Sequence, residues 1–185
     1  MRYLEVQKFW RALPRHGKIA ALDVGTRHVG VAVSDEGRQF VSPMTTFSRS
    51  KSGEWRNGSI AVQSFSKKMQ EFVDKENCCG FVVGIPLKDG ETTPFCKEIV
   101  DLMLNINCTA KPQNQLRMEQ DIDDDNDNYD KDEMFFTLWD EYNSTMESRR
   151  HVARTTNKRS VFMKHKDSMA AAVILQKMLE HYNTS

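Results

Sequence analysis

Two short, almost wholly apolar runs restrict the fold of this 185-residue chain more than any other feature of its sequence. They are Phe81–Ile85 and Met134–Trp139, and a segment with apolar residues at helical spacing precedes each of them. Strands that are apolar on both sides are typical of parallel strands covered by helices on both faces of a sheet. The two runs therefore predict an α/β domain.

An antiparallel meander is predicted ahead of these runs. Residues 19–22 form a short apolar segment that ends at Asp23, and valines alternate with small residues over 29–34. Alternation with a period of two is typical of a strand. Residues 39–42 supply a third short strand. The predicted fold class is thus a mixed α/β sheet, with an antiparallel three-strand meander plus two parallel strands, flanked by helices.

Helices and domain organisation follow from the remaining periodicity. Helices are expected over residues 59–76, 95–106 and 144–154, and from near Asp167 to the C-terminus. Residues 1–17 carry apolar side chains at helical spacing and are expected to form an N-terminal helical extension. Residues 18–185 are expected to form one domain, which fits its size.

An acidic segment interrupts this domain and hides its charge. The chain has 26 basic and 26 acidic residues, but residues 119–133 hold nine of the acids and one base. The rest of the chain therefore carries an excess of eight basic residues, which suits a polyanionic partner. Residues 111–133 contain too few apolar side chains to order themselves, so we expect a disordered insert there.

Several classes of protein are disfavoured by composition. No run approaches the roughly 18 apolar residues of a membrane span, and the N-terminus lacks the apolar core of a signal peptide. The cysteines show neither a C-x-x-C pair nor a histidine at zinc-ligand spacing, which favours reduced thiols in an intracellular protein. We therefore expect an intracellular location, either cytoplasmic or organellar (chloroplast or mitochondrion), and no membrane partner. The sequence gives no indication of the oligomeric state.

Acidic residues mark the predicted ends of strands, where sites form in open α/β sheets. Asp23 ends the first strand, Asp140 and Glu141 follow the last, and Asp167 opens the final helix, where the helix dipole favours its charge. Clustered carboxylates repel one another and need a cation, and oxygen ligands suit Mg²⁺ or Mn²⁺. On spacing alone, a turn residue (Asp23) and a helix-terminal charge (Asp167) explain these acids better than a metal site does.

Five sequence blocks, in order, resemble the YqgF/RuvX family of Holliday-junction-resolvase-like proteins. The blocks are residues 22–35, 41–44, 82–90, 140–147 and 166–176. The resemblance implies a ribonuclease H-like fold and a nuclease that acts on the 5′ side of pre-16S rRNA; cleavage of Holliday junctions has also been proposed for the family. It further implies that Asp23, Glu141 and Asp167 are the metal ligands and catalytic residues, with Asp140 as a further candidate ligand.

The resemblance leads to a functional expectation: a Mg²⁺- or Mn²⁺-dependent endonuclease whose substrate is an rRNA precursor or branched DNA. Ribosomal particles are a further candidate partner. Tyr142 departs from the family, which has an arginine there. The predicted nucleic-acid contacts are Arg27, Lys88, Arg149, Arg150, Lys158, Arg159, Lys164 and Lys166. Two rival hypotheses remain: a non-catalytic nucleic-acid or ribosome-associated binding protein that kept the fold, and a nucleotide binder with an actin-like opening turn.

Overall fold

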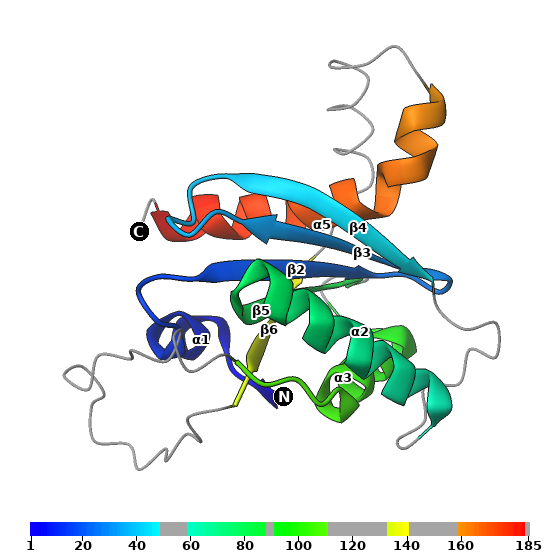
Figure 1. Ribbon diagram of the computed structural model, residues 1–185, viewed down its shortest axis with the longest axis horizontal. Helices are drawn as coiled ribbons and strands as arrows, with labels where there is room; N and C mark the ends of the chain where they lie inside the picture. Colours follow the sequence, from blue (N-terminus) through cyan, green and yellow to red (C-terminus); the bar gives the residue numbers. More distant parts are fainter. Residues whose placement is uncertain (49–58, 88–90, 111–132, 141–158, 184–185) are drawn as a thin grey trace.

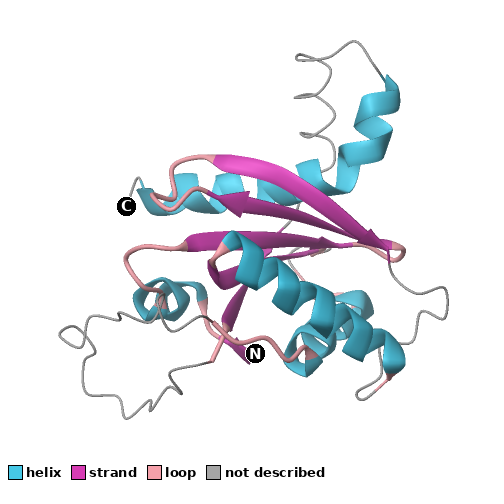
Figure 2. Cartoon of the chain, in the orientation of Figure 1, coloured by secondary structure: helices cyan, strands magenta, loops and turns pink. Residues whose placement is uncertain are grey.

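A mixed sheet with helices on both faces forms the core of the protein (Figures 1 and 2). This computed structural model describes residues 1–48, 59–87, 91–110, 133–140 and 159–183, with the backbone alone for 159–164 and 183. The strands are β1 (Arg2–Tyr3), β2 (Lys18–Val24), β3 (His28–Ser34), β4 (Val41–Ser48), β5 (Cys78–Ile85) and β6 (Phe135–Asp140). The helices are α1 (Val6–Ala12), α2 (Ile60–Glu76), α3 (Pro94–Asn105) and α5 (Arg159–Asn183).

The strand order is β1-β6-β5-β2-β3-β4. Strands β2, β3 and β4 pair antiparallel, whereas β5 pairs parallel with both β2 and β6. Every residue of β5 is buried, as its apolar sequence predicts for a central parallel strand. The predicted fold class, a meander that continues into parallel strands, is confirmed.

The two faces of the sheet carry separate hydrophobic clusters because side chains alternate along each strand. On β2, Ala20 and Leu22 belong to the cluster under α2 and α3, whereas Ile19 and Ala21 belong to the cluster under α1 and α5. Figure 1 shows α5 lying along β3 and β4 on one side of the sheet, with α2 and α3 on the other. A functional side chain can therefore be assigned to a face from its position along a strand.

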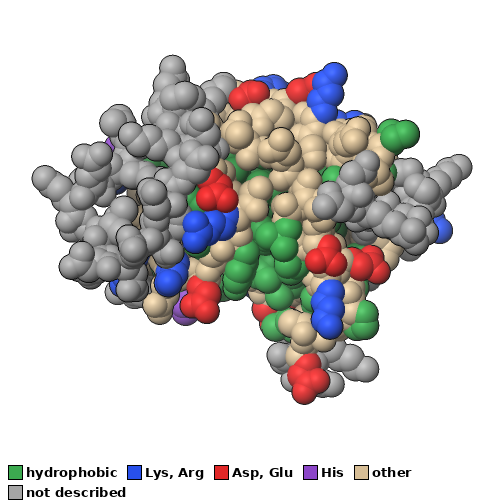
Figure 3. Space-filling view, turned by 90° about the horizontal axis from the view of Figure 1, so that it is seen from below, with side chains coloured by type: hydrophobic (Ala, Val, Ile, Leu, Met, Phe, Trp, Pro, Cys, Tyr) green, Lys and Arg blue, Asp and Glu red, His purple; other side chains and the backbone are tan. Residues whose placement is uncertain are grey.

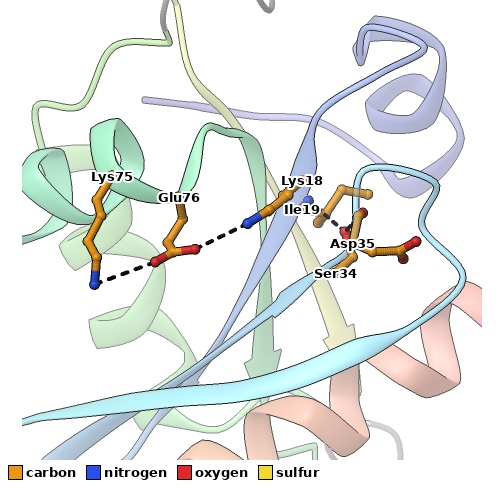
Figure 4. Close-up of polar contacts among 6 residues, drawn as sticks. All are labelled: Lys18, Ile19, Ser34, Asp35, Lys75 and Glu76. Carbon is orange, nitrogen blue, oxygen red and sulfur yellow. Dashed lines mark hydrogen bonds and ion pairs between the residues drawn. The ribbon is translucent and has the colours of Figure 1, made fainter.

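Polar contacts at the amino end of β2 tie the sheet to its surroundings (Figure 4). Lys18 Nζ lies 3.2 Å from Glu76 Oε2 at the end of α2, and Glu76 Oε1 also lies 3.7 Å from Lys75 Nζ. The buried Ser34 hydroxyl accepts a hydrogen bond from the Ile19 amide (3.0 Å) and donates one to the Asp35 carbonyl (2.8 Å). Both hydrogen-bonding roles of this buried hydroxyl are therefore filled.

The N-terminal segment differs from the single helix expected there. It begins with strand β1, which pairs parallel with β6, and the helix α1 spans only Val6–Ala12. A two-residue strand has no periodicity of its own, so the sequence pattern missed it. Phe9 and Leu13 are buried, and a Cβ on Gly80 would lie 2.9 Å and 2.7 Å from their side chains. The segment thus packs tightly on β5.

Helix α5 also differs from the prediction, because it begins at Arg159 rather than near Asp167. Asp167 consequently lies inside the helix, and the argument that the helix dipole stabilises its charge is wrong. Residues 159–166 lack apolar periodicity but include several good helix formers, which explains the late predicted start. The predicted helix over 144–154 and the acidic insert up to residue 132 lie outside the described residues.

Within the part of the chain that the structure describes, no helix combines the length and apolar character needed to cross a membrane.

Candidate functional site

Asp23 occupies the carboxyl end of β2 in the middle of the sheet. It pairs with Gly30 on β3 and with Gly84 on β5. Alternation along β2 places Asp23 on the same face as Ile19 and Ala21, the face that α5 covers. The Asp23 side chain is half-buried, and neither lateral neighbour has a side chain that could fill the space beside it.

Asp167 reaches this place because α5 packs directly on the backbone of β3. A Cβ on Gly30 would overlap the carbonyl group of Asp167, so only glycine permits this approach. The contact places the backbone of Asp167 over Gly30, the residue that pairs with Asp23 on the neighbouring strand. Asp167 is partly buried, and its carboxylate lies 3.8 Å from Lys166 Nζ. The structure thus places the backbones of two of the predicted site residues, Asp23 and Asp167, near each other.

Asp140 takes a different position. It ends β6, is exposed, and pairs with Ile85. Phe136 and Leu138 pack in the α2/α3 cluster, so alternation places Asp140 on that face, opposite Asp23. Glu141 lies outside the described residues.

The donor chemistry of the Asp23–Asp167 pair fits a hard divalent cation. Both side chains offer only carboxylate oxygens, the ligands that Mg²⁺ and Mn²⁺ prefer. Two carboxylates that met at this position would repel each other, and a bound cation would relieve that repulsion. Among the described residues, no group of three or more acidic, histidine or cysteine side chains is arranged to hold a metal. A complete ligand set therefore requires a further residue.

The cysteines do not contribute to this chemistry. All four are free and buried. Burial raises the pKa of the Cys78 and Cys79 thiols, and it raises the pKa of Cys108 to about 12. These three thiols therefore stay neutral near pH 7 and are poor metal ligands and nucleophiles.

The predicted nucleic-acid contacts are only partly described. Arg27 is exposed in the turn that joins β2 to β3, four residues after Asp23, and Lys166 directly precedes Asp167. Arg159 and Lys164 lie in the first turns of α5, where only the backbone is described. Lys88, Arg149, Arg150, Lys158 and the atypical Tyr142 lie outside the described residues. On the face shown in Figure 3, the coloured basic side chains are interspersed with acidic ones and do not form a single patch.

Sequence reasoning overlooked how Gly30 shapes the site. A glycine facing the end of a neighbouring strand, within an otherwise valine-rich alternation, was the available signal. The alternation alone does not indicate that a helix packs on this glycine, so the sequence pattern gives no reason for a glycine there. The structure shows that it admits the backbone of α5.

Comparison with known proteins assigns the family. The family model named RuvX, described as a Holliday junction resolvase, matches residues 17–181. The chain belongs to the RuvX family. Its expected membership is thereby confirmed, and the match covers β2 through most of α5, including Asp23 and Asp167.

Curated relatives of this RuvX protein carry the name "Putative pre-16S rRNA nuclease". The one from Rhizobium meliloti (strain 1021) is 27% identical over 181 residues, covering 97% of this chain and 90% of the relative. The one from Ruegeria pomeroyi is 28% identical over 176 residues, covering 95% and 94%. The family description, Holliday junction resolvase, and the name of these relatives both denote enzymes that cut nucleic acid. The nuclease character expected for the family is therefore confirmed.

Solved structures show a more distant likeness. Thermus thermophilus RuvC in complex with a Holliday junction substrate is 9% identical with a TM-score of 0.45, covering 91% of this chain and 98% of that one. The yeast mitochondrial Holliday junction resolvase Ydc2 is 11% identical with a TM-score of 0.44, covering 92% and 83%. Likeness of this degree carries no argument about function.

Proposed function

We propose that this RuvX protein is a Mg²⁺- or Mn²⁺-dependent endonuclease that hydrolyses phosphodiester bonds in an rRNA precursor, of the kind that matures the 5′ side of 16S rRNA. The observation that carries the proposal is the placement of Asp167 over Gly30, next to Asp23. The nuclease names of its relatives supply the substrate class.

In this proposal Asp23 and Asp167 hold the metal, and Glu141 completes the ligand set. A bound divalent ion would activate a water molecule and stabilise the leaving phosphate oxygen. Asp23 is held by the centre of the sheet and Asp167 by a long helix packed on β3, so both carboxylates start from fixed backbones. Such rigid support keeps reacting groups in position without further ordering.

The remaining roles fall to nearby basic residues. Arg27 follows Asp23 in the β2–β3 turn, where its guanidinium can contact a phosphate next to the scissile bond.

Asp140, on the opposite face of the sheet, is a weaker candidate ligand than Glu141.

A second candidate substrate is branched DNA. The description of the family as a Holliday junction resolvase favours it. Because the same carboxylates would hold the metal, only the substrate distinguishes this candidate from the first.

The test compares the wild type with Asp23→Asn on two labelled substrates, a pre-16S rRNA fragment and a four-way DNA junction, with Mn²⁺ and then with EDTA. We expect cleavage only by the wild type with Mn²⁺, and the preferred substrate decides between the two candidates. Glu36→Gln, an exposed carboxylate in the β3–β4 turn, is the matched control and should cleave normally. Binding without cleavage by the wild type would instead support the non-catalytic hypothesis.

A thermal melt adds a readout that does not depend on cleavage. In EDTA, Asp23→Asn should melt at a higher temperature than the wild type, because one of two neighbouring negative charges is gone. Mn²⁺ should raise the melting temperature of the wild type and have little effect on the variant. Normal cleavage by a well-folded Asp23→Asn protein would disprove the assignment.

A further inference from the structure

A chain of aromatic rings leads away from the proposed site on the face of the sheet that carries α1 and α5. The ring of Trp139 on β6 lies 5.7 Å from that of His181, which lies 5.6 Å from that of Tyr182. Tyr182 in turn lies 4.7 Å from Trp10 on α1. Trp10, Trp139 and the adjacent pair formed by His181 and Tyr182 are distant from one another in sequence, and the fold brings them together.

This chain of rings is connected to the site through the sheet. Trp139 pairs with Gly84, and Gly84 pairs with Asp23, so all three lie in one row across β6, β5 and β2. Trp139 packs with the α1/α5 cluster, which is the face of Asp23. At about 4.8 Å per strand, the backbones of Trp139 and Asp23 are about 10 Å apart.

Basic side chains occupy the same edge of α5. At 100° per residue, Lys166, Lys177 and His181 fall within about 60° of one another around the helix. His181 contacts Trp139, so this edge faces β6 at the C-terminal end of the helix. From Lys166 to His181 the edge is about 22 Å long, which matches about six nucleotides at 3.4 Å each.

Exposure leaves this surface accessible to a ligand. His181 is exposed, and Trp139, Tyr182, Trp10 and Lys177 are each partly exposed. The Arg38 guanidinium lies 5.6 Å from the centre of the Trp10 ring and adds a positive charge at the far end. Positive charge alongside aromatic faces is the combination by which proteins bind single strands of nucleic acid.

We propose that these residues, which we call the α5 strip (Trp10, Trp139, Lys166, Lys177, His181 and Tyr182), bind a single strand of the substrate as it leaves the Asp23–Asp167 site. The inference rests on the proposed function and extends it: the substrate has a single-stranded segment next to the scissile bond. Bases stack on the exposed rings, and phosphates lie along the lysines.

The test measures binding in EDTA, where no cleavage occurs, with a fluorescent 12-nucleotide oligouridine as the probe. Lys177→Gln should weaken binding about threefold and lower the slope of log affinity against log salt by about 0.7, the value for one lost contact to a single strand. Lys68→Gln removes the same charge from the exposed surface of α2, on the other face of the sheet, and should leave both quantities unchanged.

The aromatic part of the strip has its own variants. Trp139→Leu should weaken binding about tenfold with an unchanged salt slope, whereas Trp139→Phe should retain most of the affinity, since stacking needs only a ring. If Trp139→Leu fails to fold, His181→Ala serves in its place, because that side chain is exposed.

Three results would overturn the inference. The first is an equal loss of affinity in Lys177→Gln and Lys68→Gln, and the second is unchanged affinity in both the folded Trp139→Leu and His181→Ala variants. The third is that the variants weaken the binding of duplex RNA as much as that of the oligouridine. Its failure can be told apart from failure of the nuclease assignment. Cleavage that depends on Asp23 with no role for the strip would reject only the strip. A binding strip in a protein that never cleaves would reject only the nuclease.

Discussion

The absence of a side chain at Gly30 sets how closely α5 can approach the sheet. The carbonyl of Asp167 occupies the space that a Cβ would take, and the neighbouring residue on β2 is Asp23. The lack of a Cβ at this position therefore affects both the packing of α5 and the geometry of the proposed metal site.

We expect Gly30→Ala to lower the free energy of unfolding by about 3 kcal/mol, because the methyl group meets backbone that cannot move aside alone. It should also abolish Mn²⁺ binding by moving Asp167 away from Asp23. Urea denaturation and a Mn²⁺-dependent thermal shift measure the two effects. Gly37→Ala is the control: its Cβ would lie 3.3 Å from the Asp35 carboxylate in an open turn, so a change within about 0.5 kcal/mol is expected. Equal stabilities of the two variants would contradict the prediction.

Asp35 organises the turn between β3 and β4. Its Oδ1 accepts hydrogen bonds from the amides of Gln39 (2.7 Å) and Phe40 (2.8 Å). These amides favour the charged carboxylate, the one from Phe40 most strongly, and so lower the pKa of Asp35. A carboxylate whose pKa is lowered in the folded state stabilises the fold above its ordinary pKa near 4, and loses that effect as the pH falls through the lower folded value.

We therefore expect Asp35→Ala to lower the free energy of unfolding by about 1 kcal/mol at pH 7. This difference from the wild type should shrink as the pH falls below about 4 and the carboxylate becomes protonated. Because the side chain is near the surface, salt should also reduce part of the effect. Urea denaturation at pH 7 and pH 2 checks it, and an equal difference at both pH values would refute the charge argument.

At the scale of elements, the first 17 residues act as a part of the core. Phe9 is fully buried against Gly80 of β5, and β1 extends the sheet beyond β6. Arg38, held in the left-handed region at φ 54°, donates hydrogen bonds to the carbonyls of Pro14 and Gly17. The β3–β4 turn thereby fastens the end of the N-terminal segment to the sheet.

Phe9→Ala should consequently lower the free energy of unfolding by about 3 kcal/mol, as expected for removing a buried ring. Gln7→Ala, an exposed position on the same helix, should change it by less than about 0.5 kcal/mol. Denaturant melts of both variants provide the measurement. A small effect of Phe9→Ala would show that residues 1–17 contribute little to the stability of the domain.

At the scale of the whole molecule, the described residues on either side of the acidic segment lie next to each other. Thr109 and Glu133 form an antiparallel bridge, and the side chain of Gln70 holds the amide and carbonyl of Thr109 at 2.9 Å and 3.2 Å. Glu133 also lies 4.0 Å from Arg2. Contacts among the described residues therefore hold Thr109 and Glu133, on either side of the acidic segment, next to each other.

Replacing residues 119–132, which hold eight acids and one base, with a Gly/Ser segment of equal length should leave the melting temperature unchanged. If the acids compete with nucleic acid for the basic surface, the replacement should tighten oligonucleotide binding several-fold at low salt. The gain should shrink as salt screens both interactions. A scrambled tract of the same composition is the control and should bind like the wild type. Unchanged affinity at low salt would leave the segment without this role.

The sequence by itself determined the order and type of the central elements. Period-two alternation over β3 and apolar runs at β5 and β6 reflect which faces are buried, and burial is a local pattern that the sequence records directly. The motif blocks also located Asp23 and Asp167 as candidate ligands.

Only the tertiary structure decided which of these residues meet. Strand β1 exists because β6 offers it a partner, and α5 begins early although its first turns have no apolar pattern. The approach of Asp167 to Asp23 depends on a glycine in a third segment, and the α5 strip joins residues 10, 139, 181 and 182. Such contacts depend on strand register and helix placement, which are set by packing across the whole sheet and leave no local trace in the sequence.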